Sequence, residues 1–182
     1  PDDLVELLDV LIRNQYWREA TSWLEELDQR APSDVRRVVL RARWLASQER
    51  HDEVPALVAA FAEEHRPKED DAAKIAAFDL ALAEASLAGK QSSDAEKWYR
   101  QAAVHSISAL PALARFLAGD GRAELAVETC TKAADGDHDE ALAVVLADIL
   151  ARHEVAGYVA EPAEKLMAAV LAAPTPSVET LR

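Results

Sequence analysis

The chain has 182 residues, half of them apolar, so it is long enough to bury a substantial core. Its formal net charge of −13 would repel a polyanion, so we expect no nucleic-acid partner. Its apolar runs are also far shorter than the roughly 20 residues that cross a bilayer. We therefore expect no membrane insertion.

The composition favours an all-α fold, because alanine and leucine dominate and aromatic residues make up only 5% of the chain. The single cysteine, Cys130, excludes an internal disulfide framework. No secretory signal is recognised, and the cytoplasm is slightly favoured. Because the chain begins at Pro1 and not at Met, we expect it to be a fragment from which a targeting segment could be missing.

Apolar residues recur at intervals of three and four, the spacing of one helix face. Near the N-terminus, Ala20, Leu24 and Leu27 form one such stripe, which faces a second stripe of Leu4, Leu7, Leu8 and Leu11. Two helices and a turn cannot bury both faces alone, so the hairpin needs similar neighbours. We predict one solenoid over residues 1–182, with hairpins at about 1–33, 34–67, 70–105, 107–136 and 137–175 and a truncated helix at 176–182.

Glycine and proline positions agree with these boundaries, because neither residue is favoured inside a helix. Pro55, Pro111 and Pro162 are predicted to lie in first turns, where the missing N–H is harmless. Gly119 and Gly157 are predicted to lie in connections. The loop at 63–71 has no apolar residue and is predicted to be solvated.

The first hairpin resembles the tetratricopeptide repeat, a family of stacked helical hairpins. The resemblance lies in a small residue followed by two bulky ones and a proline: Ala20, Leu24, Leu27 and Pro32. Related but irregular patterns follow along nearly the whole chain. The resemblance implies a right-handed superhelical stack of antiparallel helical hairpins, whose concave groove is lined by the first helices and holds peptide segments of partner proteins.

On this basis the expected function is a protein-protein interaction scaffold that binds a partner protein or peptide. The alternative is a structural spacer or self-association segment of a larger multi-repeat protein. The resemblance implies that polar residues from the first helices of four hairpins line the groove: Asp2, Glu6, Asp9, Arg13, Arg36, Arg43, Ser47, Glu84 (or Asp79) and Arg115. A second interpretation remains open, namely that these residues are solvated or form salt bridges between neighbouring helices.

No pattern indicates a catalytic, cofactor or metal site, so we expect the chain not to be an enzyme. A phosphate-binding glycine loop, a nucleophile elbow and a zinc motif are all missing from the sequence. The acidic run from Asp135 to Glu140 lacks the Gly and Glu positions of a calcium loop, and we interpret it as a turn that caps a helix. Cys130 is predicted to be a core residue. Trp17 and Trp98 are predicted to pack between hairpins, and Trp23 and Trp44 to be more exposed.

Overall fold

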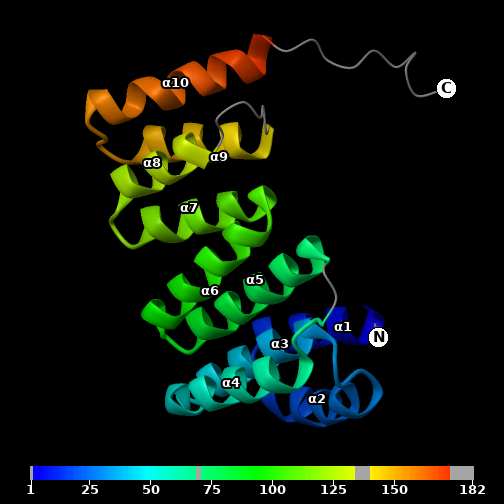
Figure 1. Cartoon of the computed structure of the whole chain (residues 1–182). Coiled ribbons are helices and arrows are strands. Elements are labelled where there is room, and N and C mark those ends of the chain that lie inside the picture. Colours follow the sequence, from blue (N-terminus) through cyan, green and yellow to red (C-terminus); the bar gives the residue numbers. More distant parts are fainter. Residues whose placement is uncertain (1, 69–70, 134–139, 173–182) are drawn as a thin grey trace, which may run out of the picture. The chain divides into compact units, whose positions relative to one another are not determined.

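The structure is a computed structural model that describes residues 2–68, 71–133 and 140–172. All regular secondary structure in these ranges is helical, which confirms the all-α prediction (Figure 1). In chain order the elements are α1 (Asp2–Arg13), α2 (Trp17–Arg30), α3 (Val35–Ser47), η1 (His51–Glu53), α4 (Val54–His65), α5 (Ala72–Ala88), α6 (Ser92–His105), η2 (Ile107–Ala109), α7 (Leu110–Gly119), α8 (Ala123–Ala133), α9 (Glu140–Arg152) and α10 (Gly157–Ala172).

These helices form two compact units, unit 1 (Pro1–Ala109) and unit 2 (Leu110–Arg182). In unit 1, α3 packs against α1 on one side and α5 on the other, so the first helices of three successive hairpins lie next to one another (Figure 1). The second helix α4 packs against α3 and α5, and α6 packs against α5. In unit 2, α7 and α8 form one pair, α9 and α10 another, and the pairs pack together through α7–α9 and α8–α10 contacts.

The core of the first hairpin follows the predicted stripe. Ala20, Leu24 and Leu27 are fully buried against Leu8 and Leu40, which joins the first hairpin to the second. Each fully buried leucine contributes roughly 2 kcal/mol through removal of apolar surface from water. Leu7, expected in the same apolar stripe, is instead partly exposed on the outer side of α1.

The second core cluster joins the second and third hairpins. Val54, Val58 and Phe61 of α4 pack with Phe78 and Leu82 of α5. The rings of Phe61 and Phe78 stack, with their centroids 5.8 Å apart. Apolar residues from different hairpins therefore share one core within unit 1.

Helix α5 also meets α4 at its end, where Gly89 is buried in the turn before α6. A Cβ placed on Gly89 would lie only 2.6 Å from Cβ of Val54. The absence of a side chain at this position allows the turn and the first residue of α4 to approach one another closely.

The helix boundaries of unit 2 differ from the prediction at three positions. Gly157 begins α10, and Pro162 lies inside it, because the Ala160 N–H donates to the Ala156 carbonyl at 3.0 Å and closes a turn before the proline. Gly119 is the last residue of α7 and not part of the connection. The chain reverses instead at Gly121, whose φ of +80° suits glycine. Pro55 and Pro111 do lie in first turns.

The tryptophans follow the prediction with one exception. Trp17 and Trp98 pack against core clusters, and Trp23 is 42% exposed. Trp44 was expected to be exposed but packs against the two core clusters described above, because α3 has neighbours on both sides. Arg41 and Arg50 lie over its ring, at 5.8 and 5.7 Å from the centroid.

Two predictions lie outside the described residues, namely the turn at Asp135–Asp139 and the truncated helix at 176–182. Within the part of the chain that the structure covers, no helix combines the length and the apolar character needed to cross a membrane.

Candidate functional site

The three first helices of unit 1 enclose a hollow of about 450 Å³, here called the groove. Residues of α1, α3 and α5 line it, at positions three or four apart on each helix. They are Val5, Glu6 and Asp9 from α1, Val35, Arg36, Val39, Leu40 and Arg43 from α3, and Ala77, Leu80, Ala81 and Glu84 from α5. This spacing explains why one face of each helix contributes to the same hollow.

The groove has an apolar floor and a charged rim. On α3, Val39 and Leu40 are buried, whereas Arg36 is exposed. The small side chains of Ala77 and Ala81 keep the α5 wall low. Such a surface can accept apolar side chains on its floor while charged groups at its edge interact with the same ligand.

Arg36 is held by two carboxylates. Its Nη2 lies 2.6 Å from Oδ2 of Asp34, and its Nη1 lies 2.8 Å from Oδ1 of Asp2. Hydrogen bonding from Arg36 lowers the pKa of Asp34, and the two carboxylates raise the pKa of Arg36. Asp34 also accepts a hydrogen bond from the Arg36 backbone N–H at 2.9 Å and so caps α3.

Arg43 connects all three groove helices. Its Nη1 donates to Oδ1 of Asp9 on α1 at 2.9 Å, and its Nη2 lies 3.7 Å from Oε2 of Glu84 on α5. Asp9 is shared with Arg13, whose Nη2 lies 2.6 Å from its Oδ2. Because these side chains are partly exposed, each pair contributes no more than about 1 kcal/mol to stability. The pairs fix the geometry of the rim more than they stabilise the fold.

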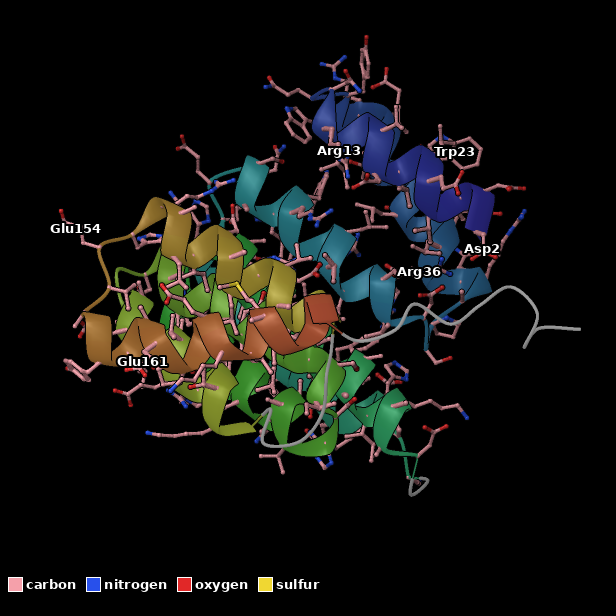
Figure 2. All side chains as sticks on the ribbon, turned by 90° about the horizontal axis from the view of Figure 1, so that it is seen from above. Asp2, Arg13, Trp23, Arg36, Glu154 and Glu161 are labelled. Carbon is pink, nitrogen blue, oxygen red and sulfur yellow. The ribbon has the colours of Figure 1, made fainter. Side chains whose placement is uncertain are left out.

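Five of the nine predicted groove residues line this hollow: Glu6, Asp9, Arg36, Arg43 and Glu84. Asp2 reaches its edge through the ion pair with Arg36, and Arg13 lies near the other end of α1 (Figure 2). The Ser47 hydroxyl donates to the Trp44 carbonyl at 2.5 Å at the end of α3 and does not line the groove. Arg115 lies on α7 of unit 2 and is not among the residues that unit 1 brings together.

The predicted groove residues are all polar, so the residues of the apolar floor were not among them, although their signal was present in the sequence. The predicted residues of each helix imply neighbours one turn away on the same face. Val39 and Leu40 lie between Arg36 and Arg43, and Leu80 lies one turn before Glu84. Because the prediction named polar residues only, it did not include the apolar residues that alternate with them along each helix.

Asp79, considered as an alternative to Glu84, does not face the groove. Its side chain is fully buried, and burial raises the pKa of its carboxyl group. Its Oδ2 accepts a weak hydrogen bond from Nη2 of Arg66 at 3.4 Å, whereas Oδ1 accepts none within the described residues. Positions 79 and 84 are five apart and therefore point to different sides of α5.

The charged loop after α4 is thus less solvated than predicted. Helix α4 continues to His65, whose ring packs on Phe61 with centroids 4.7 Å apart. Arg66 turns back to Asp79 and also lies over the ring of Trp98, 5.9 Å from its centroid. A buried carboxylate on the next helix explains why this end of the loop is held to the protein.

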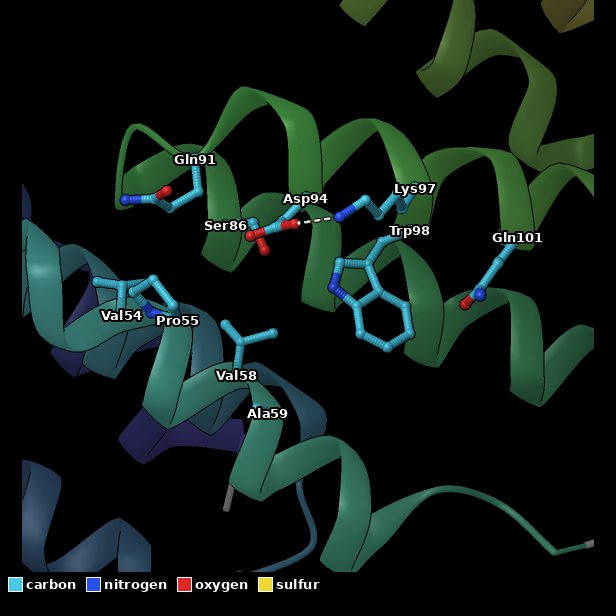
Figure 3. Close-up of a pocket in the computed structure, with 10 residues that line it drawn as sticks. All are labelled: Val54, Pro55, Val58, Ala59, Ser86, Gln91, Asp94, Lys97, Trp98 and Gln101. Atoms are coloured by element: carbon cyan, nitrogen blue, oxygen red, sulfur yellow. Dashed lines mark hydrogen bonds and ion pairs between the residues drawn. The ribbon is translucent and has the colours of Figure 1, made fainter.

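A second hollow, of about 310 Å³, lies between the second helices α4 and α6 (Figure 3). Trp98 of α6 faces Val58 of α4 across it, and Ser86 of α5 contributes to its lining. Lys97 at its edge donates to Oδ1 of Asp94 at 2.7 Å. The α4 side of this hollow is apolar, and the two charged residues that line it, Asp94 and Lys97, neutralise each other on α6.

The thiol of Cys130 and the hydroxyl group of Tyr99 belong to buried side chains. Cys130 is fully buried, as predicted, and burial raises the pKa of its thiol to about 12. Burial likewise raises the pKa of Tyr99 to about 12. Among the described residues, no three His, Cys, Asp or Glu side chains converge as metal ligands would.

The groove of unit 1 therefore brings charged and apolar groups from three separate helices together on one surface. Comparison of the chain with protein-family models and with curated proteins gives no match, so its function is inferred from this geometry.

Proposed function

We propose that this chain is an irregular tetratricopeptide-like scaffold, and not an enzyme, which binds a partner protein or peptide in the groove of unit 1. The observation that carries the proposal is the groove itself, an apolar floor with a charged rim built from three successive first helices. The buried Ala20, Leu24 and Leu27 support the repeat interpretation of the first hairpin, because they occupy its small and bulky positions.

The size and lining of the groove suit a peptide segment. A volume of about 450 Å³ accommodates several side chains, and hollows of this size commonly bind ligands. Exposed Ala77 lets a ligand backbone approach α5 closely. A segment with apolar residues on one side would place them on Val39 and Leu80 while its polar side remained in water.

A second candidate is a spacer or self-association segment, and one observation favours it. Leu7 and Val10 are exposed and lie three residues apart on the same side of α1. An exposed apolar pair of this kind would be covered if copies of the chain packed together. Sedimentation across a range of protein concentrations separates the candidates, because a concentration-independent monomer argues against self-association.

Selection of binding peptides tests the groove. A random peptide display library is panned on the immobilised chain, and enriched peptides are measured by fluorescence anisotropy against the wild type and Ala77→Arg. The arginine fills the groove from an exposed position and therefore spares the core. Ala60→Arg, an equal change at an exposed position of α4 outside both hollows, is the control.

We expect Ala77→Arg to weaken binding at least about tenfold and Ala60→Arg to leave it unchanged, since only the first obstructs the floor. Far-ultraviolet circular dichroism checks that both variants remain helical. If no enriched peptide responds to Ala77→Arg, the groove is not the binding surface and the proposal fails.

A further inference from the structure

The groove's two arginines are already neutralised within the protein. Arg36 is paired with Asp34 and Asp2, and Arg43 with Asp9 and Glu84. An anionic ligand would have to compete with carboxylates held at 2.6 to 2.9 Å in three of these four pairs. The arginines therefore link neighbouring helices through ion pairs and do not form an anion-binding site.

The carboxylates, in contrast, are not all satisfied. Glu6 on α1 is exposed at the rim and has no ion-pair partner among the described residues. Glu84 on α5 is 54% exposed, and the one ion pair that it makes within the described part of the chain, with Arg43, is long at 3.7 Å. The two carboxylates lie on the two outer helices of the groove, with the apolar surface of α3 between them.

The net charge around the groove is also negative. The groove lining and the residues ion-paired with it include five carboxylates (Asp2, Glu6, Asp9, Asp34 and Glu84) and three guanidinium groups (Arg13, Arg36 and Arg43), a net charge of −2. The whole chain carries −13. Such a field attracts cationic segments and repels anionic ones before contact is made.

From these observations, and resting on the function proposed above, we infer that the groove's partner is a basic amphipathic peptide segment. Its aliphatic side chains lie on Val39 and Leu80, and lysine or arginine side chains flanking them pair with Glu6 and Glu84. The apolar floor supplies contact area, and the two rim carboxylates select the sign of the charge. Acidic peptides and the terminal carboxylate of a peptide are disfavoured.

Peptides enriched by panning supply the first readout. We expect their sequences to combine aliphatic residues with lysine or arginine, and their affinity to fall as salt concentration rises. Glu6→Gln and Glu84→Gln remove one rim charge each while preserving shape. Each substitution should weaken binding roughly two- to fivefold, the range for partly exposed ion pairs. Glu63→Gln, an exposed position on α4 outside the groove, is the matched control and should have no effect.

Arg43→Gln gives a test of opposite sign. It removes one positive charge and leaves Glu84 without its guanidinium partner, while Asp9 keeps its pair with Arg13, so a basic peptide should bind roughly two- to fivefold more tightly. An acid-binding groove would respond in the reverse direction. Tryptophan fluorescence and circular dichroism establish that the variant retains its fold.

The outcomes separate this inference from the function on which it rests. The enriched peptides could respond to Ala77→Arg and yet be acidic or uncharged, or they could bind Glu6→Gln and Glu84→Gln as tightly as the wild type. Either result would overturn the inference of a basic partner but leave the groove as a binding site. Weaker binding of basic peptides to Arg43→Gln would also overturn it. The absence of any peptide sensitive to Ala77→Arg would overturn both proposals.

Discussion

The packing of α4 against the turn after α5 can be tested by adding one methyl group. In Gly89→Ala, the new Cβ would lie 2.6 Å from Cβ and 2.7 Å from Cγ1 of Val54, both closer than side-chain atoms approach. The φ of Gly89 is −77°, which alanine adopts without strain. Any loss of stability would therefore come from the steric contact and not from the backbone.

The expected magnitude follows from two opposing effects. Forcing an extra methyl group into a packed contact costs about 1–3 kcal/mol. Replacing glycine by alanine where φ permits and space is free stabilises by about 0.4–1 kcal/mol through the unfolded chain. We expect Gly89→Ala to destabilise unit 1 by about 1 kcal/mol in the wild type, the difference between the middle values of these two effects. In a Val54→Gly background, which removes the opposing Cβ, the same change should be neutral or stabilising by up to about 1 kcal/mol.

The measurement uses a signal confined to unit 1. All four tryptophans (Trp17, Trp23, Trp44 and Trp98) lie in that unit, so tryptophan emission during urea denaturation follows it without a contribution from unit 2. The four proteins of the cycle give the coupling free energy directly. Gly119→Ala is the control, because a Cβ there meets no atom within 4 Å, and it should leave the tryptophan transition unchanged.

An unchanged midpoint in Gly89→Ala would refute the close contact with Val54. An equal effect of the substitution in both backgrounds would refute it as well, since the loss would then not depend on Val54. Either result would contradict the close approach of the first residue of α4 to the turn after α5.

Three further predictions concern charge, reactivity and capping. Because burial raises the pKa of Asp79, its ionisation opposes folding at neutral pH, so Asp79→Asn should raise the free energy of unfolding at pH 7. This gain should vanish below the pKa of an unfolded aspartate, near 4, and an equal gain at both pH values would contradict the reasoning. Cys130 is fully buried, and burial raises the pKa of its thiol to about 12. It should therefore react with a thiol reagent at pH 8 at least about 100-fold more slowly in the native chain than in urea. Fast labelling of the native chain would contradict the placement of Cys130 in the core. Asp34→Ala should cost about 1 kcal/mol in the tryptophan-detected urea transition because it removes the cap of α3, whereas Asp34→Asn should cost less because its side chain can still accept from the Arg36 N–H.

Local sequence patterns were sufficient for the helices themselves. The apolar stripe of Ala20, Leu24 and Leu27 predicted both the span and the buried face of α2, because burial along a helix depends on residues within one or two turns. The sequence pattern was a less reliable guide to where each helix begins and ends. Pro162 looked like a first-turn residue, but a preceding turn closed by the Ala160 N–H moved the start of α10 to Gly157.

For the groove, too, the sequence predicted which face of a helix a residue occupies, but not which residue of another helix it meets. Helical spacing placed Glu6, Asp9, Arg36, Arg43 and Glu84 on surfaces that do line one hollow. Spacing left open whether the arginines are solvated or paired with carboxylates of neighbouring helices, because a charged residue at the edge of a helix looks the same in sequence in both cases. The structure shows that Arg36 and Arg43 are paired.

The sequence by itself determined the all-α class, the helical segments and the apolar stripe of the first hairpin, since these properties depend on the order of neighbouring residues. Only the tertiary structure decided which charges pair. Asp9 and Arg43 are 34 residues apart, and they meet because α1 and α3 pack side by side in one register. Burial of Asp79 and exposure of Glu6 are likewise set by what neighbouring helices cover, which the order of residues along one helix does not show.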